Sequence, residues 1–298
     1  MEELKKKRRW GDRRDGRRLR TLSPISMVSP YIMKTRAGAQ NKVHYTLDIE
    51  KVEEYIRKKR KEGLKSFGVL HVLVAAYIRT VARRPAINRF VSGQKIYARN
   101  NIEAIMAIKL SMTLDAPDTM IKLPFSPDAT ADDVYHAFVR EIEANRGAEG
   151  ATDESAFDKT ARILRYIPGL LLKLTVSFLS FLDYFGLLPR FLTKVSPFHG
   201  SLVITSMGSL GIPPIYHHLY DFGNIPIFIA YGAKKKMIVP SRGTCEPEYK
   251  KFLDFTVTTD ERICDGYYFA SALKLLCSIL ENPEVLDTPP TEVIEDID

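Results

Sequence analysis

The sequence predicts a mixed α/β (α+β) fold in which helices cover one face of a sheet. Its 298 residues are 45% hydrophobic, which is enough apolar material for one large domain or two small ones. Segments of helical spacing and short apolar runs typical of strands follow one another without a strict strand–helix–strand order. The three cysteines, Cys245, Cys264 and Cys277, lie far apart without a CxxC pair, so neither a disulfide framework nor a zinc site is expected.

The first elements follow from apolar spacing and from residues that end helices. Val43 to Leu47 is typical of a short strand, and Asp48 can cap a helix that ends before Gly63. Gly68 to Arg84 has the almost continuous apolar pattern of a buried helix, which Pro85 stops.

The middle of the chain adds one strand and one helix. Ile102 to Leu110 is an apolar run expected of a strand in the interior of a sheet. Thr130, with Asp133 three residues later, predicts a helix start, and Gly147 its end. A linker is expected from Gly147 to Ser155.

The C-terminal part predicts several strands and a final helix. The expected strands are Leu202 to Thr205, Ile225 to Tyr231, Met237 to Val239 and Phe252 to Thr258. A helix from Tyr267 to Leu280 follows, and residues 285–298 form an acidic tail with two prolines.

Most of the net charge of +8 lies at the N-terminus. Residues 1–20 contain ten Lys or Arg and four acids, whereas the remaining chain is nearly neutral. This predicts a flexible basic arm before a single domain over residues 21–284, and it argues against a nucleic-acid-binding face, which would spread its charge over a folded surface. Because no secretory signal is visible, a reducing cytoplasm is expected.

An apolar helical insert is expected at about residues 157–198. The longest stretch without a charge in its most apolar part is the nine residues from Leu174 to Leu182, well short of the roughly 20 needed to span a bilayer. Helices that are apolar on all sides must be covered. The insert is therefore expected to pack in a core or subunit interface, to form a lid for a long acyl chain, or to lie on a membrane surface, where the basic arm would attract anionic lipid.

Two motifs carry a resemblance to a known family. The segment Asp260-Glu261-Arg262-Ile263-Cys264-Asp265-Gly266, followed by a helix, resembles the active-site signature His, three residues, Asp, Gly of the chloramphenicol acetyltransferase and dihydrolipoyl acyltransferase families. Leu202 to Gly208, with Leu210 and Gly211, is similar to their strand and glycine turn. The resemblance covers about Ser26 to Leu280, apart from the insert.

The resemblance implies a fold, a ligand and an assembly. The fold would be the chloramphenicol acetyltransferase-like mixed sheet, and the protein a homotrimer with active sites between subunits. Each site would bind a coenzyme A thioester and transfer its acyl group to an acceptor without a metal ion. A catalytically silent binding or assembly protein with the same fold is the alternative.

The alternative arises because Glu261 occupies the position of the family's catalytic histidine. A base must remove the acceptor's proton, and an ordinary glutamate, with a pKa of about 4.3, does so poorly. Three hypotheses stay open. Burial raises the pKa of Glu261 so that it acts as the base. His217 or His218 supplies the base instead. Otherwise the chemistry has been lost.

The resemblance also assigns roles to residues around this position. Thr205 aligns with the family's serine, whose hydroxyl stabilises the oxyanion, while Ser206 and Gly208 are the expected coenzyme A-binding residues. Asp265 matches the signature aspartate, which fixes the active-site segment through an arginine. Arg17, Arg18 or Arg20 is the partner expected from position. Gly208 and Gly211 lie in no GxxxxGK or GxGxxG pattern and are expected to form a turn and not a phosphate cradle.

Overall fold

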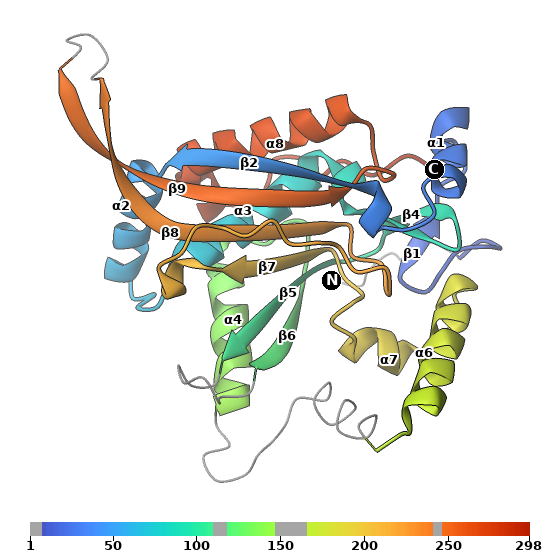
Figure 1. The fold of residues 1–298 in the computed structure, drawn as a ribbon. Coiled ribbons are helices and arrows are strands. Elements are labelled where there is room, and N and C mark those ends of the chain that lie inside the picture. The colour runs from blue at the N-terminus through green and yellow to red at the C-terminus, as the bar shows by residue number, and fades with distance from the viewer. Residues whose placement is uncertain (1–7, 110–117, 147–165, 241–245) are drawn as a thin grey trace.

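The structure is a computed structural model that describes residues 8–109, 118–146, 166–240 and 246–298. A mixed six-stranded sheet is its centre, in the order β2-β9-β8-β7-β5-β6 (Figure 1). Strand β7 is parallel to β5 and β8, and the other neighbours are antiparallel. The strands are β2 (Gln40–Asp48), β5 (Ile102–Lys109), β6 (Asp118–Phe125), β7 (Leu202–Ser206), β8 (Ile227–Pro240) and β9 (Pro247–Asp260).

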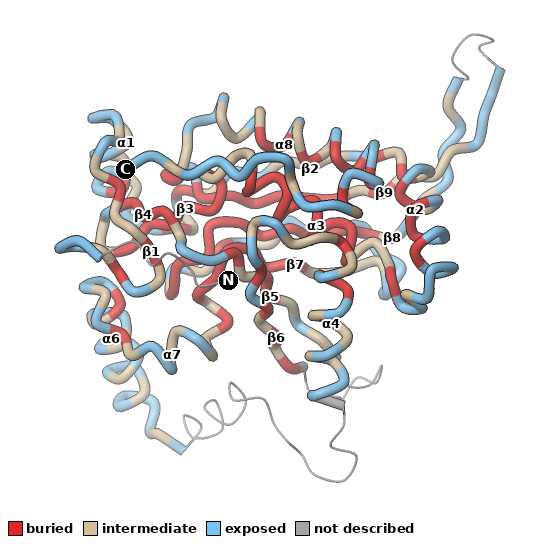
Figure 2. Tube along the Cα trace, turned by 180° about the vertical axis from the view of Figure 1, so that it is seen from behind, coloured by how far each residue is buried: buried red, intermediate tan, exposed pale blue. Residues whose placement is uncertain are grey.

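Helices cover one face of this sheet. They are α2 (Glu50–Lys61), α3 (Val69–Arg83), α4 (Ala131–Arg146) and α8 (Gly266–Glu281). Helix α3 is buried along nearly its whole length, and the main apolar core lies between these helices and the sheet (Figure 2). The mixed sheet with helices on one face confirms the predicted fold class.

An extended segment covers part of the opposite face. Residues 212–222 cross β8 and β9, where the hydroxyl groups of Thr256 and Thr258 donate hydrogen bonds to the carbonyls of Ile215 and His217, at 2.6 and 2.7 Å. A smaller apolar cluster that includes Leu219, Ile225 and Phe228 lies between this segment and the sheet.

Several predicted elements match the structure and others do not. The two long helices beginning near residue 68 and residue 267 are confirmed as α3 and α8. The strands expected at Ile225 to Tyr231 and Met237 to Val239 are one strand, β8, because the shift in pairing between Tyr231 and Lys234 bends it without ending it. Strand β6 was not predicted. The expected linker at Gly147 to Ser155 lies outside the described residues, as does the first part of the insert.

The prediction of a flexible basic arm is wrong for residues 8–20. This segment contains β1 (Gly16–Arg18), which joins β4 (Lys95–Arg99) and β3 (Arg89–Ser92) in a second sheet of order β1-β4-β3. The pairing places Arg13 in the interior, where it is 6% exposed. Charge density alone could not predict this, because the counterions come from distant parts of the chain.

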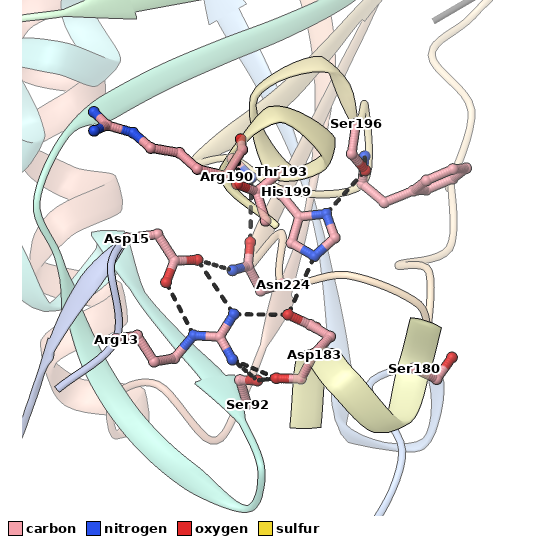
Figure 3. A network of polar contacts seen from close by, with 12 residues as sticks. Arg13, Asp15, Ser92, Ser180, Asp183, Arg190, Thr193, Ser196, His199 and Asn224 are labelled. Atoms are coloured by element: carbon pink, nitrogen blue, oxygen red, sulfur yellow. Dashed lines mark hydrogen bonds and ion pairs between the residues drawn. The ribbon is translucent and has the colours of Figure 1, made fainter. Parts of the chain in front are cut away.

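Those counterions form a buried polar network (Figure 3). The Arg13 guanidinium pairs with the carboxylates of Asp15 at 2.9 Å and Asp183 at 2.7 Å, and it donates to the Ser92 hydroxyl. His199 Nε2 lies 3.4 Å from the same Asp183 carboxylate. Burial by itself raises the pKa of Asp183, but His199 and Arg13 outweigh burial and hold that pKa well below its usual value.

The acidic tail supplies the other counterions. The Arg20 and Thr21 amides donate to the Asp298 carbonyl at 2.9 and 2.8 Å, and Arg17 pairs with the Asp298 carboxylate at 2.9 Å. Arg17 also donates to the Asp296 carbonyl at 2.9 Å, and the Asp296 carboxylate makes a two-pronged contact with Arg89 on β3, at 2.7 and 2.5 Å. The basic N-terminal segment and the acidic C-terminal segment are therefore joined.

The described part of the insert forms two helices at one end of the molecule. Helix α6 (Gly169–Tyr184) and helix α7 (Arg190–Val195) lie beside the small sheet (Figure 1). Asp183 is the single buried residue of α6, so the expectation that its apolar surface packs in the core is wrong within one chain. No helix among the described residues is long and apolar enough to cross a membrane.

Candidate active site

The candidate site lies at the C-terminal end of β9, where Glu261 follows the last residue of the strand. The Glu261 amide donates to the Ala39 carbonyl at 2.8 Å, which continues the pairing between β9 and β2 by one residue. The Asn41 side-chain amide donates to the Glu261 carboxylate at 3.0 Å. The carboxylate is thus oriented by a neutral donor, and the residue is exposed in the single chain.

Buried ion pairs fix the backbone on which Glu261 stands. The Arg262 guanidinium makes two contacts with the Asp260 carboxylate, at 2.8 and 2.7 Å, and Arg36 lies 3.5 Å from the same carboxylate. Arg262 also donates to the Met33 carbonyl at 2.8 Å. Burial lowers the pKa of Arg36 and Asp260 opposes this effect, so one aspartate stabilises two buried cations.

Glu261 lines a surface hollow of about 460 Å³. Helix α1 (Pro24–Ile32) forms one wall, and the start of α8 forms another. The hollow is mostly apolar, with Glu261 and Asp265 as its exposed acids. Its lining comprises Ile25, Ser26, Ser29, Ile32, Met33, Asn41, Thr259, Asp260, Glu261, Arg262, Cys264, Asp265, Gly266 and Phe269.

Asp265 has a different partner from the one predicted. Its carboxylate accepts a hydrogen bond from the Tyr268 amide at 2.8 Å and caps the N-terminus of α8. Arg17 pairs with Asp298, and Arg20 pairs with Asp12. The expected arginine partner for Asp265 is therefore wrong, and the ion pair of Asp260 with Arg262 fixes the segment instead.

The predicted oxyanion and coenzyme A residues lie far from Glu261 in the same chain. The arrowheads of β7 and β9 point to opposite ends of the sheet (Figure 1). Thr205 pairs with Ala230, and Ala230 pairs with Thr256, five residues before Glu261. Two strand spacings of ~4.8 Å and five residues of ~3.3 Å place Thr205 roughly 19 Å from Glu261.

Ser206 and Gly208 belong to the same distant end of β7. The Ser206 hydroxyl hydrogen-bonds to Tyr231, where burial raises the pKa of the phenol and this bond lowers it. A side chain at Gly208 would approach the Gly232 carbonyl to 2.8 Å. The turn is confirmed as a packing feature, and the single chain does not bring these residues to the hollow.

His217 and His218 lie on the opposite face of the sheet from Glu261. The His217 carbonyl accepts from Thr258, whereas Glu261 shares a face with Asn41, the partner of Thr259 in the β2–β9 register. Successive strand residues point to opposite faces. His217 stacks on Phe228 at 4.0 Å, and burial, together with His218 and Lys42, lowers its pKa. Neither histidine can therefore act on the Glu261 hollow of its own chain.

Comparisons of the structure identify proteins with the same fold. A probable dihydrolipoamide acetyltransferase from Listeria monocytogenes is 14% identical, with a TM-score of 0.55 over 88% of this chain and 95% of that one. The dihydrolipoamide acetyltransferase of Azotobacter vinelandii is 12% identical, with a TM-score of 0.57 over 88% and 87%. The cubic core of a pyruvate dehydrogenase multienzyme complex is 14% identical, with a TM-score of 0.50 over 90% and 92%.

The chain has the fold of the dihydrolipoamide acetyltransferase catalytic cores. This confirms the fold family that the two motifs indicated. No family model and no curated protein matches the sequence. At 12–14% identity the likeness establishes the fold alone.

The site contains residues that the sequence did not single out. Asn41, Arg36 and Asp260 reach the site from separate elements. A signal existed for Asp260 and Arg262, because two charged residues of opposite sign flank the motif position at the end of a predicted strand.

The described residues offer neither a metal site nor a reactive thiol here. No group of three or more His, Cys, Asp or Glu among them could hold a metal ion. Burial raises the pKa of Cys264, which lines the hollow, to about 12, so its thiol stays protonated near neutral pH.

Proposed function

We propose that the protein is an acyltransferase that binds a coenzyme A thioester in the hollow at Glu261 and transfers the acyl group to an acceptor. The observation that carries this proposal is the position of Glu261. Its carboxylate lines a hollow, Asn41 orients it, and buried ion pairs hold its backbone. In the Azotobacter protein, a serine, a histidine and an asparagine have been studied for roles in catalysis. That histidine and asparagine lie four residues apart, as Glu261 and Asp265 do here.

The reaction requires two proton transfers: one from the acceptor to Glu261, and one from Glu261 to the sulfur of coenzyme A. The carboxylate of Glu261 takes the proton of the acceptor thiol or hydroxyl as its heteroatom attacks the thioester carbonyl. A hydroxyl donor, for which Thr205 is proposed, stabilises the resulting oxyanion. The intermediate then collapses, the carbon–sulfur bond breaks, and the coenzyme A sulfur receives the proton.

A second copy of the chain must complete this site. Because Glu261 and Thr205 lie roughly 19 Å apart within one chain, they can meet only if β7 of one copy approaches the hollow of another. We therefore propose a homo-oligomer, a trimer in its simplest form, in which Ser206 and Gly208 contact the thioester from the neighbouring copy. Cover by that copy would also bury Glu261, the condition under which a carboxylate becomes an effective base.

The test is thioester turnover by Glu261→Gln. The purified protein is incubated with a panel of acyl-coenzyme A thioesters and acceptors, and free coenzyme A is detected with a thiol reagent. The substitution should lower turnover by about 10²- to 10⁴-fold, the usual contribution of a general base, without changing thermal stability. Glu54→Gln is the matched control, since Glu54 is an exposed residue of α2 and does not line the hollow at Glu261. Equal turnover by wild type and Glu261→Gln would refute the proposed base.

A catalytically silent binding or assembly protein is the second candidate. Two observations favour it: the carboxylate stands in place of an imidazole and is exposed in the single chain, and neither His217 nor His218 can reach it there. This candidate predicts saturable binding of a thioester with no release of coenzyme A by the wild-type protein. Measurable wild-type turnover that depends on Glu261 would exclude it.

A further inference from the structure

The apolar surface of α6 points away from the protein. Leu170, Leu174, Phe178, Phe181 and Phe185 follow one another at intervals of four, four, three and four residues, so they share one side of the helix. Each is between 56% and 76% exposed. An ordinary surface helix is polar on its exposed side, whereas α6 is apolar both there and on its less exposed side, where Leu172, Leu179 and Leu182 lie.

A polar clamp at the end of the helix maintains this orientation. Asp183, the buried residue of α6, is held by the Arg13 guanidinium and faces His199 (Figure 3). Next to it, Gly186 packs against the Arg13 side chain, and the Tyr184 hydroxyl donates to the Gln94 side chain at 2.8 Å. The helix is thus attached through polar contacts near its C-terminal end, and its apolar side remains free.

The charges around the stripe have one sign. Over residues 166–198 the exposed charged residues are Lys173, Arg190 and Lys194, and the single acid, Asp183, is buried and paired. Lys173 lies on α6 itself, and Arg190 and Lys194 lie on the next helix, α7. Two helices with an apolar stripe and only basic exposed charges are complementary to a surface that is apolar inside and negatively charged at its edge. A layer of anionic phospholipid has this composition.

We propose that α6 and α7 form a docking surface for an anionic lipid membrane. With 16 residues, α6 is about 24 Å long and cannot cross a hydrocarbon core of about 30 Å. It therefore lies in the plane of the membrane surface, with the five stripe residues among the acyl chains and the basic residues at the phosphate groups. A second copy on the stripe fits less well, because the two copies would contribute six basic residues to one contact, and residues 166–198 have no exposed acid to pair with them.

This inference does not depend on the acyltransferase proposal. Membrane docking through α6 is possible whatever reaction the protein performs. The experiment measures binding to vesicles and not thioester turnover, so the two proposals can fail separately.

The test is co-flotation of the full chain with vesicles. The wild-type protein should float with vesicles of phosphatidylcholine and phosphatidylglycerol, much less with phosphatidylcholine alone, and less as salt is added. The double variant Phe178→Ser with Phe181→Ser should lower the partition coefficient at least about tenfold, since two large apolar groups no longer leave water. Lys173→Gln with Lys194→Gln should remove most of the preference for the anionic vesicles.

A matched control variant is available at the far end of the molecule. Ile238 and Tyr249 pair across β8 and β9 and are 60% and 71% exposed. Ile238→Ser with Tyr249→Ser removes two large apolar side chains of comparable exposure and should leave flotation unchanged. Circular dichroism and thermal melting of each variant establish that it is folded.

Three results would overturn the proposal. One is wild-type protein that does not float with anionic vesicles. A second is equal loss of flotation in the two apolar double variants. The third is that Phe178→Ser with Phe181→Ser changes the sedimentation mass and not the flotation, which would make α6 an interface between copies of the chain.

Discussion

Replacing Asp260 by asparagine tests whether buried ion pairs hold the candidate site. The Asp260 carboxylate is 1% exposed and lies between the guanidinium groups of Arg262 and Arg36. Asparagine preserves the size of the side chain but removes the negative charge. Two buried cations are then left without their counterion. Removing one partner of a buried ion pair destabilises the fold strongly, because the remaining charge is buried and unpaired.

The expected loss of stability follows from this geometry. Removing one partner of a buried pair costs about 3–5 kcal/mol, and both contacts of Arg262 are short, so we expect a decrease in the free energy of unfolding of about this size. Urea unfolding followed by far-ultraviolet circular dichroism measures it, at one fixed protein concentration because an oligomer would add to the stability. The single tryptophan, Trp10, is 93% exposed and is a poor reporter of unfolding.

An exposed ion pair provides the comparison. Glu54 lies 3.9 Å from Arg57 on the surface of α2, and Glu54→Gln should cost no more than about 0.5 kcal/mol. If Asp260→Asn also cost less than about 1 kcal/mol, the two arginines would not depend on Asp260 for their charge balance. The account of how the Glu261 segment is held would then be wrong.

Three further perturbations test the clamp and one close backbone contact. Arg13→Met should lower the free energy of unfolding in urea by about 3–5 kcal/mol, because Asp15 and Asp183 both lose the buried guanidinium that pairs with them. Since the pKa of Asp183 is depressed in the folded protein, its contribution is complete above the unfolded value of about 3.9 and is lost as the pH falls further. The stability difference between wild type and Asp183→Asn should therefore shrink below about pH 4 in acid titrations followed by circular dichroism. Gly223→Ala should cost about 2–5 kcal/mol in thermal melting compared with wild type, because φ is +87° and the new methyl group would collide with the Phe198 carbonyl.

The sequence predicts the central layers well because burial leaves a periodic signal. Helix α3 is apolar on nearly every side, and Pro85 marks its end, so both its type and its end could be predicted. Strand β6 was not recognised because Lys122 and Pro124 interrupt its apolar pattern. The small sheet was missed because β1 is rich in arginine, and its stability comes from partners that are far away in the sequence.

The motif predicted the position of the candidate site in the sequence, but it did not predict which distant residues complete the site. Glu261 and Asp265 were found because they are close in sequence and precede a helix. Arg36 and Asn41 reach the site through the pairing of β2 with β9, a contact between segments about 220 residues apart that no local pattern encodes. The mistaken arginine partner of Asp265 has the same origin, since Asp298 pairs with Arg17 from the other end of the chain.

The contacts between the two terminal segments make the N-terminal fold sensitive to ionic strength. The pairs that Asp298 makes with Arg9 and Arg17 are open to water, so added salt screens them, while the enclosed contact of Arg89 with Asp296 is screened far less. In concentrated salt β1 should therefore exchange its amide hydrogens faster than β3, which lies at the other edge of the same sheet. Part of the positive charge of the N-terminal segment thus forms ion pairs within the chain, and the strength of these pairs depends on the salt concentration.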